Sequence, residues 1–244
     1  MKTVLITGCS SGFGLETARY FLERDWNVVA TMRTPRADML PPSSRLRIIA
    51  LDVVDAHSIA QAIEAAGPID VLVNNAGIGA LGALEGTTMA TARELVETNT
   101  LGTIAMTQAV LPQFRQRQGG VIVNVTSSVT YEPLPLLSVY TASKAAVNAF
   151  TESLALELAP FNIRARLVLP GRAPETRFGE NARPRMEGAI PEAYADLAQR
   201  VFAGWSGSQA VTLARDVAEA VWRAATDPAA PMRIAAGADA VALA

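Results

Sequence analysis

The chain contains 244 residues, with 21 Lys and Arg against 23 Asp and Glu, so its formal net charge is −2. Half of the residues are apolar and 18% are charged, a balance that fits a soluble globular protein with a large core. A charge this close to neutral argues against a protein that binds the phosphate backbone of a nucleic acid.

Short apolar runs rich in β-branched residues alternate with longer stretches of helical periodicity. The runs predict strands at Thr3–Thr7, Asn27–Met32, Leu46–Leu51, Val71–Asn74, Val121–Val125, Ile163–Leu169 and, more weakly, Met232–Ala235. The periodic stretches predict helices near Gly12–Arg24, Ser58–Ala66, Met89–Arg115, Val139–Leu158 and Arg215–Thr226. Strand runs without polar alternation indicate a sheet covered on both faces. The pattern predicts a doubly wound α/β fold with about seven parallel strands, in one domain over residues 1–244.

The interval Arg172–Ser208 interrupts this alternation. It contains no predicted strand and includes Pro174, Pro184 and Pro191. A connection this long in a compact domain is usually functional or disordered, and its four aromatic residues argue against disorder. We therefore predict a helical lid over a binding site.

The sequence has one cysteine and one histidine, and this scarcity argues against several classes of protein. Cys9 is the lone cysteine and cannot form an internal disulfide, which favours a reducing compartment. His57 is the lone histidine, which argues against a His-rich metal site and against a Ser-His-Asp hydrolase. The N-terminal residues show no secretory pattern, and no apolar run approaches the ~20 residues of a membrane span. We expect a cytoplasmic protein without metal, membrane or nucleic-acid partners.

A glycine-rich turn, Thr7-Gly8-Cys9-Ser10-Ser11-Gly12-Phe13-Gly14, joins the first predicted strand to its helix. Gly8 permits a tight turn, Gly12 lets the backbone approach a pyrophosphate, and Gly14 permits close packing of the helix on the strand. The helix N-terminus then offers free N–H groups and a positive dipole to phosphate. The alternative is a glycine-rich turn without a ligand.

This turn resembles the TGxxxGxG motif of the short-chain dehydrogenase/reductase family, in its single-domain branch of about 250 residues. Further matches follow in family order: Asn74-Asn75-Ala76-Gly77, Asn99, Ser127, Tyr140-x-x-x-Lys144 and Pro170-Gly171. The resemblance implies a Rossmann-type domain that binds a nicotinamide cofactor. It assigns cofactor contacts to Gly8, Ser10, Ser11, Gly12, Phe13, Gly14, Asn74, Ala76, Gly77, Tyr140, Lys144, Pro170 and Gly171. Asn74 could instead brace the centre of the sheet.

The second strand ends in Met32-Arg33, where an acidic residue would accept hydrogen bonds from a ribose 2′-hydroxyl. A guanidinium there can bind a 2′-phosphate, so Arg33 favours NADP(H), with NAD(H) possible. Arg33 could also simply be solvated, with Arg36 beside it. The resemblance implies an adenine contact at Asp52 and Val53, although a carboxylate after a strand can equally form a turn.

Tyr140 and Lys144 lie four residues apart and therefore share one face of the predicted helix. An isolated phenol has a pKa of about 10, which a nearby ammonium lowers. The resemblance implies that Tyr140 exchanges a proton with the substrate oxygen and that Lys144 holds the nicotinamide ribose. It also implies that Ser127 hydrogen-bonds the substrate oxygen and that Asn99 bends its helix and relays protons. Ser128 is the adjacent alternative to Ser127.

The family often places a Thr five residues after the Pro of Pro-Gly, whereas Thr176 lies six residues after Pro170. Its contact with the nicotinamide amide therefore depends on a bulge in the loop. The lid arginines, Arg172 foremost, could bind a substrate anion or form a mixed-charge surface. Residues 78–84 and 131–137 and the aromatic residues of the lid, Phe178, Tyr194, Phe202 and Trp205, should supply the pocket walls. The apolar part of these walls favours a hydrophobic ketone, aldehyde or secondary alcohol.

The predicted function is interconversion of a carbonyl and an alcohol by hydride transfer from or to NADP(H). A sensor that binds NADP(H) without turnover is the alternative, and a lyase or dehalogenase on the same fold is a third. A stripe on the catalytic helix, Ala146, Phe150, Leu154 and Leu158, could pair two or four copies of the chain or pack on its own sheet. The resemblance favours a homodimer or homotetramer through this helix.

Overall fold

The computed structural model describes residues 1–207 and 210–244. Its strands are β1 (Thr3–Ile6), β2 (Asn27–Met32), β3 (Leu46–Ala50), β4 (Val71–Asn74), β5 (Gly120–Val125), β6 (Ile163–Pro170) and β7 (Arg233–Ala236). They form one parallel sheet with the order β3-β2-β1-β4-β5-β6-β7. The predicted single-domain, doubly wound α/β fold is confirmed, and each predicted strand agrees with the structure to within one residue at either end.

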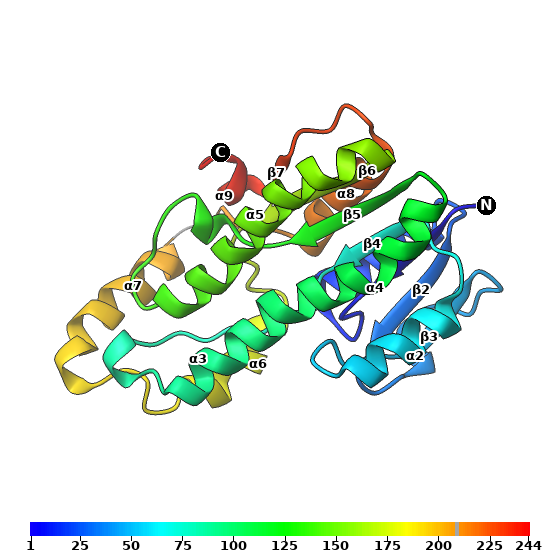
Figure 1. Ribbon diagram of the computed structural model, residues 1–244. Coiled ribbons are helices and arrows are strands. Elements are labelled where there is room, and N and C mark those ends of the chain that lie inside the picture. The colour runs from blue at the N-terminus through cyan, green and yellow to red at the C-terminus, as the bar shows by residue number, and fades with distance from the viewer. Residues whose placement is uncertain (208–209) are drawn as a thin grey trace.

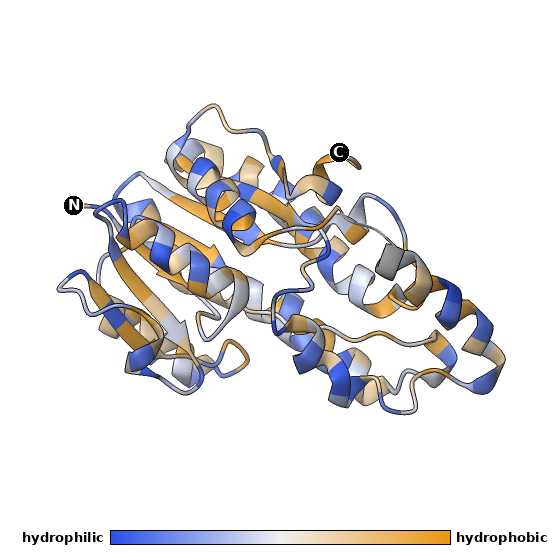
Figure 2. Ribbon diagram, turned by 180° about the vertical axis from the view of Figure 1, so that it is seen from behind, coloured by the Kyte–Doolittle hydropathy of each residue, from blue (hydrophilic) through white to orange (hydrophobic). Residues whose placement is uncertain are grey.

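Helices cover both faces of this sheet (Figure 1). They are α1 (Gly12–Leu22), α2 (Ala56–Ala66), α3 (Met89–Val96), α4 (Gly102–Gln116), α5 (Ser138–Leu158), α6 (Phe178–Ala182), α7 (Ala195–Gly207), α8 (Ala214–Thr226) and α9 (Ala238–Val241). The strands are predominantly hydrophobic, while hydrophilic residues lie on the outer faces of the helices (Figure 2). This distribution follows from a sheet buried on both sides.

Two cores stabilise the layers. One lies between the sheet and helices α1 and α8, and includes Phe21, Trp26 and Val221. The other lies between the sheet and helices α2, α4 and α5, and includes Met106 and Phe114. Burial of apolar surface on both faces is the main source of stability of such a fold.

The predicted helix Met89–Arg115 is divided in the structure. Helices α3 and α4 are separated by a π-helical turn, Glu97–Leu101, which contains the buried Asn99. The prediction of a bend at Asn99 agrees with this turn, while the prediction of one continuous helix was wrong. A π-helical turn inside an α-helix is frequently found at a functional site.

The carboxyl ends of the strands meet at one edge of the sheet. β1 and β4 are neighbours there although β2 and β3 lie between them in the chain, so the winding direction reverses at this point. Such a reversal opens a crevice in which α/β proteins bind ligands.

The connection after β6 is helical as predicted, with α6 and α7 beyond this edge (Figure 1). Its last predicted residue, Ser208, lies outside the described residues. No helix in the described part of the chain combines the length and apolarity needed to cross a membrane.

Candidate active site

The turn after β1 requires glycine for two different reasons. Gly8 and Gly12 have φ values of +75° and +57°, in the left-handed region that glycine adopts without strain. A Cβ on Gly14 would lie 2.4 Å from the carbonyl oxygen of Gly8, so only glycine allows α1 to approach the strand this closely. These findings agree with the roles predicted for Gly8 and Gly14, whereas approach of the backbone to a pyrophosphate at Gly12 stays a prediction.

Asn75 braces this turn, a role that sequence reasoning missed although the residue stands inside the quoted motif. Its Nδ2 donates to the carbonyl oxygens of Thr7 and Gly8 at 2.8 and 3.2 Å. The hydroxyl oxygen of Thr7 accepts hydrogen bonds from the backbone N–H groups of Asn75 and Ala76. The ends of β1 and β4 are thereby joined at the crevice.

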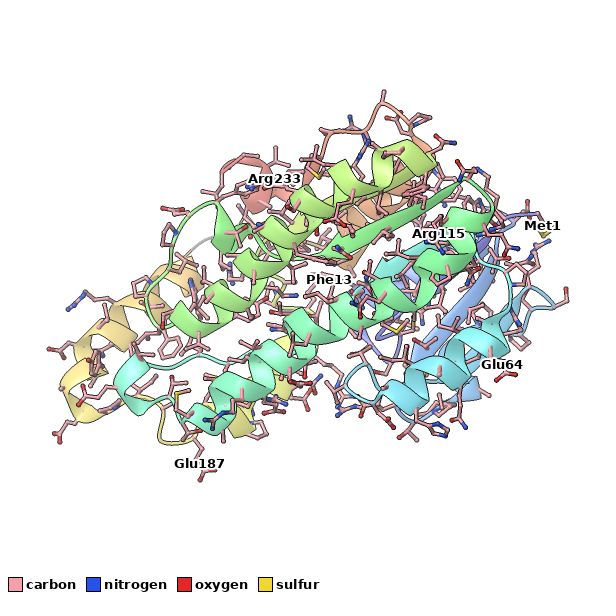
Figure 3. The ribbon with its side chains drawn as sticks, viewed as in Figure 1. Met1, Phe13, Glu64, Arg115, Glu187 and Arg233 are labelled. Atoms are coloured by element: carbon pink, nitrogen blue, oxygen red, sulfur yellow. The ribbon has the colours of Figure 1, made fainter. Side chains whose placement is uncertain are left out.

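The N-terminus of α1 is open toward this crevice. Ser11 occupies the cap position, and its side chain makes no capping hydrogen bond. A Cβ on Gly12, the first residue of α1, would meet only Thr176, at 3.5 Å. Phe13, the second residue of the helix, is labelled in Figure 3. Free N–H groups at a helix start, lined by glycine, fit a pyrophosphate. Thr176 lies across this turn, so the six-residue spacing still brings it to the crevice.

Two arginines follow β2 at the same edge, and both are exposed. Arg36 donates from Nη2 to the carbonyl oxygen of Ser10 at 3.3 Å, which places its guanidinium on the phosphate-binding turn. The charge of Arg33 lies close enough to α3 to contribute to a lowered pKa of Glu94, after the larger effect of a hydrogen bond from Arg185. Arg36 was not among the predicted site residues, and the signal for it is a second arginine three positions after Arg33.

Asp52 and Val53 lie after β3 in a turn. Oδ1 of Asp52 accepts from the backbone N–H of Val54 at 3.2 Å, the contact expected of a turn-forming carboxylate. Val53 is buried against the start of α4, where a Cβ on Gly102 would lie 2.9 Å from its Cγ2. The turn is thus fixed at the edge of the crevice.

Tyr140 and Lys144 both lie on the inner face of α5, with 8% and 6% of their surfaces exposed. Burial raises the pKa of Tyr140 to about 12, opposed by a hydrogen bond with Ser127. Burial also lowers the pKa of Lys144 to about 8. The lysine does not produce the lowered tyrosine pKa that the pair suggests, because desolvation is the larger effect here.

The lysine is held by polar groups of two other segments. Nζ donates to the carbonyl oxygen of Val125, at the end of β5, at 3.2 Å. A Cβ on Gly77 would lie 3.3 Å from this Nζ and 3.1 Å from Oδ1 of Asn99. Both polar side chains therefore lie against Gly77, and a larger residue at this position would crowd them.

Ser127 lies two residues after the end of β5, close to the predicted position. It is buried, and its hydroxyl lies near enough to Tyr140 to lower the pKa of the phenol by hydrogen bonding. Its Oγ also accepts a long hydrogen bond from the N–H of Val129, at 3.4 Å. Ser128 is equally buried, but no hydrogen bond with Ser128 contributes to the pKa of Tyr140. The geometry favours Ser127 over the adjacent serine.

Asn99 joins three segments through its side chain. Oδ1 accepts from the N–H of Ile78 at 2.8 Å, and Nδ2 donates to the carbonyl oxygen of Ile78 and to Oγ of Ser143, each at 3.0 Å. The π-helical turn, the loop after β4 and α5 are thereby held in register. The structural and the functional interpretations of Asn99 are compatible with this position.

Asn74 is a brace within the sheet. Its Nδ2 donates to Oδ1 of Asn124 at 2.9 Å and to Oγ1 of Thr107 at 3.2 Å, and its side chain is buried. The geometry therefore favours the structural interpretation.

Gly171, after Pro170, lies against the C-terminal segment of the chain. A Cβ added to Gly171 would lie 2.2 Å from Oδ2 of Asp239.

A small cavity of about 10 Å³ adjoins Tyr140. Its wall contains Ala80, Leu81, Gly82, Thr87, Leu95, Leu136, Leu137, Val139 and Arg185. Parts of both predicted wall segments line it, whereas Tyr131 does not. A cavity of this size holds about one water molecule.

The lid arginine at this cavity is Arg185. It donates from Nε and Nη2 to both carboxylate oxygens of Glu94 at 2.9 and 2.5 Å, which fastens the lid to α3. The backbone N–H of Arg172, by contrast, donates to Asp239 at 2.6 Å. Arg185 is a third residue, after Asn75 and Arg36, that sequence reasoning did not single out.

The helical stripe predicted for self-association is largely internal. Leu154 and Leu158 are buried in the chain's own core, and Phe150 packs against it. Of the four residues only Ala146 is exposed. The alternative in which this stripe forms an interface was therefore wrong, because these residues lie on the face of α5 that packs against the sheet.

Comparison with known proteins identifies the family. The model of the short chain dehydrogenase family matches residues 2–187. An uncharacterized oxidoreductase, YusZ, of Bacillus subtilis (strain 168) is 42% identical over 181 residues, covering 70% of this chain and 64% of that protein. Retinol dehydrogenase 8 of Bos taurus is 41% identical over 184 residues, covering 70% and 58%. The chain thus spans about three fifths of the length of these curated relatives.

Solved structures agree. The closed form of a serine dehydrogenase complexed with NADP+ superposes with a TM-score of 0.82 at 28% identity, covering 96% of this chain and 94% of the other. The family match, the relatives and the arrangement of Ser127, Tyr140 and Lys144 at the crevice lead to one conclusion. The chain belongs to the short-chain dehydrogenase family.

Proposed function

We propose that the protein is an NADP(H)-dependent oxidoreductase that interconverts a ketone or aldehyde and the corresponding alcohol. The observation that carries the proposal is the buried Tyr140, in hydrogen-bond contact with Ser127 and one helical turn from Lys144. Ser127 lies in the turn after β5, and Tyr140 and Lys144 lie on α5, at the edge of the sheet where the cofactor would bind. A binding protein without turnover has no need for this set.

The cofactor fits the crevice. The open N-terminus of α1 would hold the pyrophosphate, Lys144 the nicotinamide ribose, and Arg33 with Arg36 a 2′-phosphate. Asp52, Val53, Ala76 and Gly77 would line the adenosine side, and Pro170, Gly171 and Thr176 the nicotinamide side, while Asn74 braces the sheet. When bound, the cofactor supplies or accepts the hydride.

The side chains of the protein move and hold the proton. At neutral pH the hydroxyl of Tyr140, with a pKa of about 12, is protonated and would donate to the substrate oxygen during reduction. The hydroxyl of Ser127 would donate to the same oxygen and stabilise its developing negative charge. Asn99 orders the loop after β4 and would conduct protons between Lys144 and solvent through water.

The test is NADPH oxidation, followed by absorbance, with a panel of uncharged ketones and aldehydes. We expect turnover by the wild-type protein and a loss of about 10²–10⁴-fold in kcat for Tyr140→Phe, the usual contribution of a general acid. NADPH affinity should change by no more than a few-fold. Tyr131→Phe, on the neighbouring loop, is the matched control. Undiminished activity of Tyr140→Phe would remove this residue from the mechanism, and NADPH binding without any turnover would favour the sensor.

A further inference from the structure

Phe178, the first residue of α6, contacts the proposed catalytic tyrosine. The two rings meet edge to face, with their centroids 5.9 Å apart and an interplanar angle of 60°. Phe178 is nevertheless 42% exposed, so part of its ring is not covered by protein. An exposed apolar ring beside a reacting hydroxyl gains free energy when an apolar ligand covers it.

The ring of Phe178 also lies directly on the backbone of Gly79. A Cβ on Gly79 would stand 2.6 and 2.7 Å from Cε1 and Cζ of the ring. Carbon atoms in contact are ordinarily about 3.5–4.0 Å apart, so any other residue at position 79 would displace the phenyl group. The φ of Gly79 is not positive, so the backbone conformation does not require glycine here. Glycine is needed because the ring of Phe178 lies so close to the backbone.

The rest of the lid is seated on the same loop. The backbone N–H of Ala83 donates to the carbonyl oxygen of Ala189 at 2.9 Å. A Cβ on Gly82 would lie 2.6 Å from Cβ of Ala189. Together with the pair between Arg185 and Glu94, these contacts fix the lid, and with it the ring of Phe178, relative to Tyr140.

Leu81, Leu95 and Leu136 line part of the small cavity beside Tyr140, and its wall also includes Thr87 and Arg185. The charge of Arg185 is balanced by Glu94. A substrate oxygen at Tyr140 would have leucine side chains near it, and one substituent of its carbonyl carbon would lie against Phe178.

We propose that Phe178, seated on Gly79, is a specificity-determining residue that limits the size of one substituent of the carbonyl carbon. The inference rests on the proposed function and adds its substrate class: flat, uncharged, apolar ketones and aldehydes with one small substituent. Branching beside the carbonyl is rejected because the ring occupies the necessary space.

The experiment compares kcat/KM for acetophenone and isobutyrophenone, which differ only in a methyl or an isopropyl group beside the carbonyl. We expect Phe178→Ala to raise the ratio of isobutyrophenone to acetophenone by about tenfold or more, the range expected for a pocket that gains room for a methyl group. Gly79→Ala displaces the ring and should change the same ratio. In the Gly79→Ala/Phe178→Ala double variant, the ratio should equal that of Phe178→Ala alone.

The matched control is Gly179→Ala, because a Cβ on Gly179 meets nothing within 4 Å. Its ratio should stay at the wild-type value, and thermal unfolding verifies that all four variants fold. An unchanged ratio in Phe178→Ala, while the wild type reduces the small ketone, would overturn the inference and leave the proposed function intact. Independent effects of Gly79→Ala and Phe178→Ala would likewise overturn it. Failure of the wild-type protein to reduce any carbonyl would overturn both proposals.

Discussion

Tyr140 and Lys144 show how burial sets the chemistry available to single residues. Burial raises the pKa of the tyrosine to about 12 and lowers that of the lysine to about 8, so the lysine loses its proton first as the pH rises. At neutral pH the tyrosine is a proton donor and the lysine carries most of a positive charge. This state is suited to reduction of a carbonyl and to binding of an anionic cofactor.

The lysine titration predicts how NADPH binding depends on pH. The pKa of Lys144 is lowered from 10.5 to about 8, so its positive charge is present below pH 8 and is lost above it. NADPH affinity, measured by fluorescence titration between pH 6 and 9.5, should fall as the pH rises through about 8. Lys144→Met should abolish this inflection, and Lys2→Met should retain it. An inflection that persists in Lys144→Met would contradict the assignment.

Arg33 gives a second prediction at the residue scale. Arg33→Asp should weaken NADPH binding by about tenfold or more, because it replaces an attraction for the 2′-phosphate by a repulsion, and should weaken NADH binding less. Arg223→Asp, on the surface of α8, controls for the change in net charge. Equal losses for both cofactors would mean that Arg33 does not distinguish them.

The residues that sequence reasoning identified are those whose signal lies within a short segment. Gly8 and Gly12 are defined by a turn, and Tyr140 and Lys144 by one helical face. Three residues that sequence reasoning did not identify, Asn75, Arg36 and Arg185, act through contacts with segments remote in the sequence, such as the 91-residue separation of Arg185 from Glu94. Phe178 was predicted as one of the aromatic residues of the lid that line the pocket, but its packing on Gly79 was not. Such contacts depend on tertiary packing, which no local pattern contains.

At the scale of elements, the same limit explains the division between α3 and α4. Helical periodicity runs through Met89–Arg115, and the π-helical turn within it arises because Asn99 binds the backbone of Ile78. The lid is a second case. The helical character and the position of the lid were predicted, but the packing of the lid against residues 79–86 was not.

The ion pair between Arg185 and Glu94 is expected to hold the lid against α3, and this can be tested by proteolysis. Glu94→Gln removes one partner of Arg185 and should increase the rate of tryptic cleavage within residues 177–185 by about two- to fivefold, since a partly exposed ion pair contributes at most ~1 kcal/mol. Glu187→Gln is the control, because Glu187 points away from the protein (Figure 3). Equal cleavage of Glu94→Gln and the wild type would show that this pair does not hold the lid.

At the scale of the whole molecule, the alternation of strands and helices indicates a parallel sheet covered on both faces, and the predicted fold class was therefore the most secure part of the sequence interpretation. The proposal of a homodimer or homotetramer through α5 now concerns the outward face of this helix. Ala142, Ala145 and Ala149 are exposed there, and Leu156 is 79% exposed. Small residues and a leucine in this arrangement allow two helices to approach closely.

Association through this face is tested by Ala149→Arg. The added charge and bulk should convert a dimer or tetramer into smaller species in sedimentation velocity, because a charge would be buried at the helix contact. Ala65→Arg, on the exposed side of α2, should leave the sedimentation coefficient unchanged. A wild-type protein that sediments as a monomer at all concentrations would contradict the proposal.

The central claim is that the protein is a nicotinamide-dependent enzyme that prefers the phosphorylated cofactor. Parallel fluorescence titrations of the wild-type protein with NADPH and NADH test this claim most directly. The arginines after β2 and the open N-terminus of α1 predict saturable binding of both, with NADPH about tenfold tighter or more. Equal affinities or a preference for NADH would contradict the role of Arg33. Binding of neither cofactor would contradict the proposed function itself.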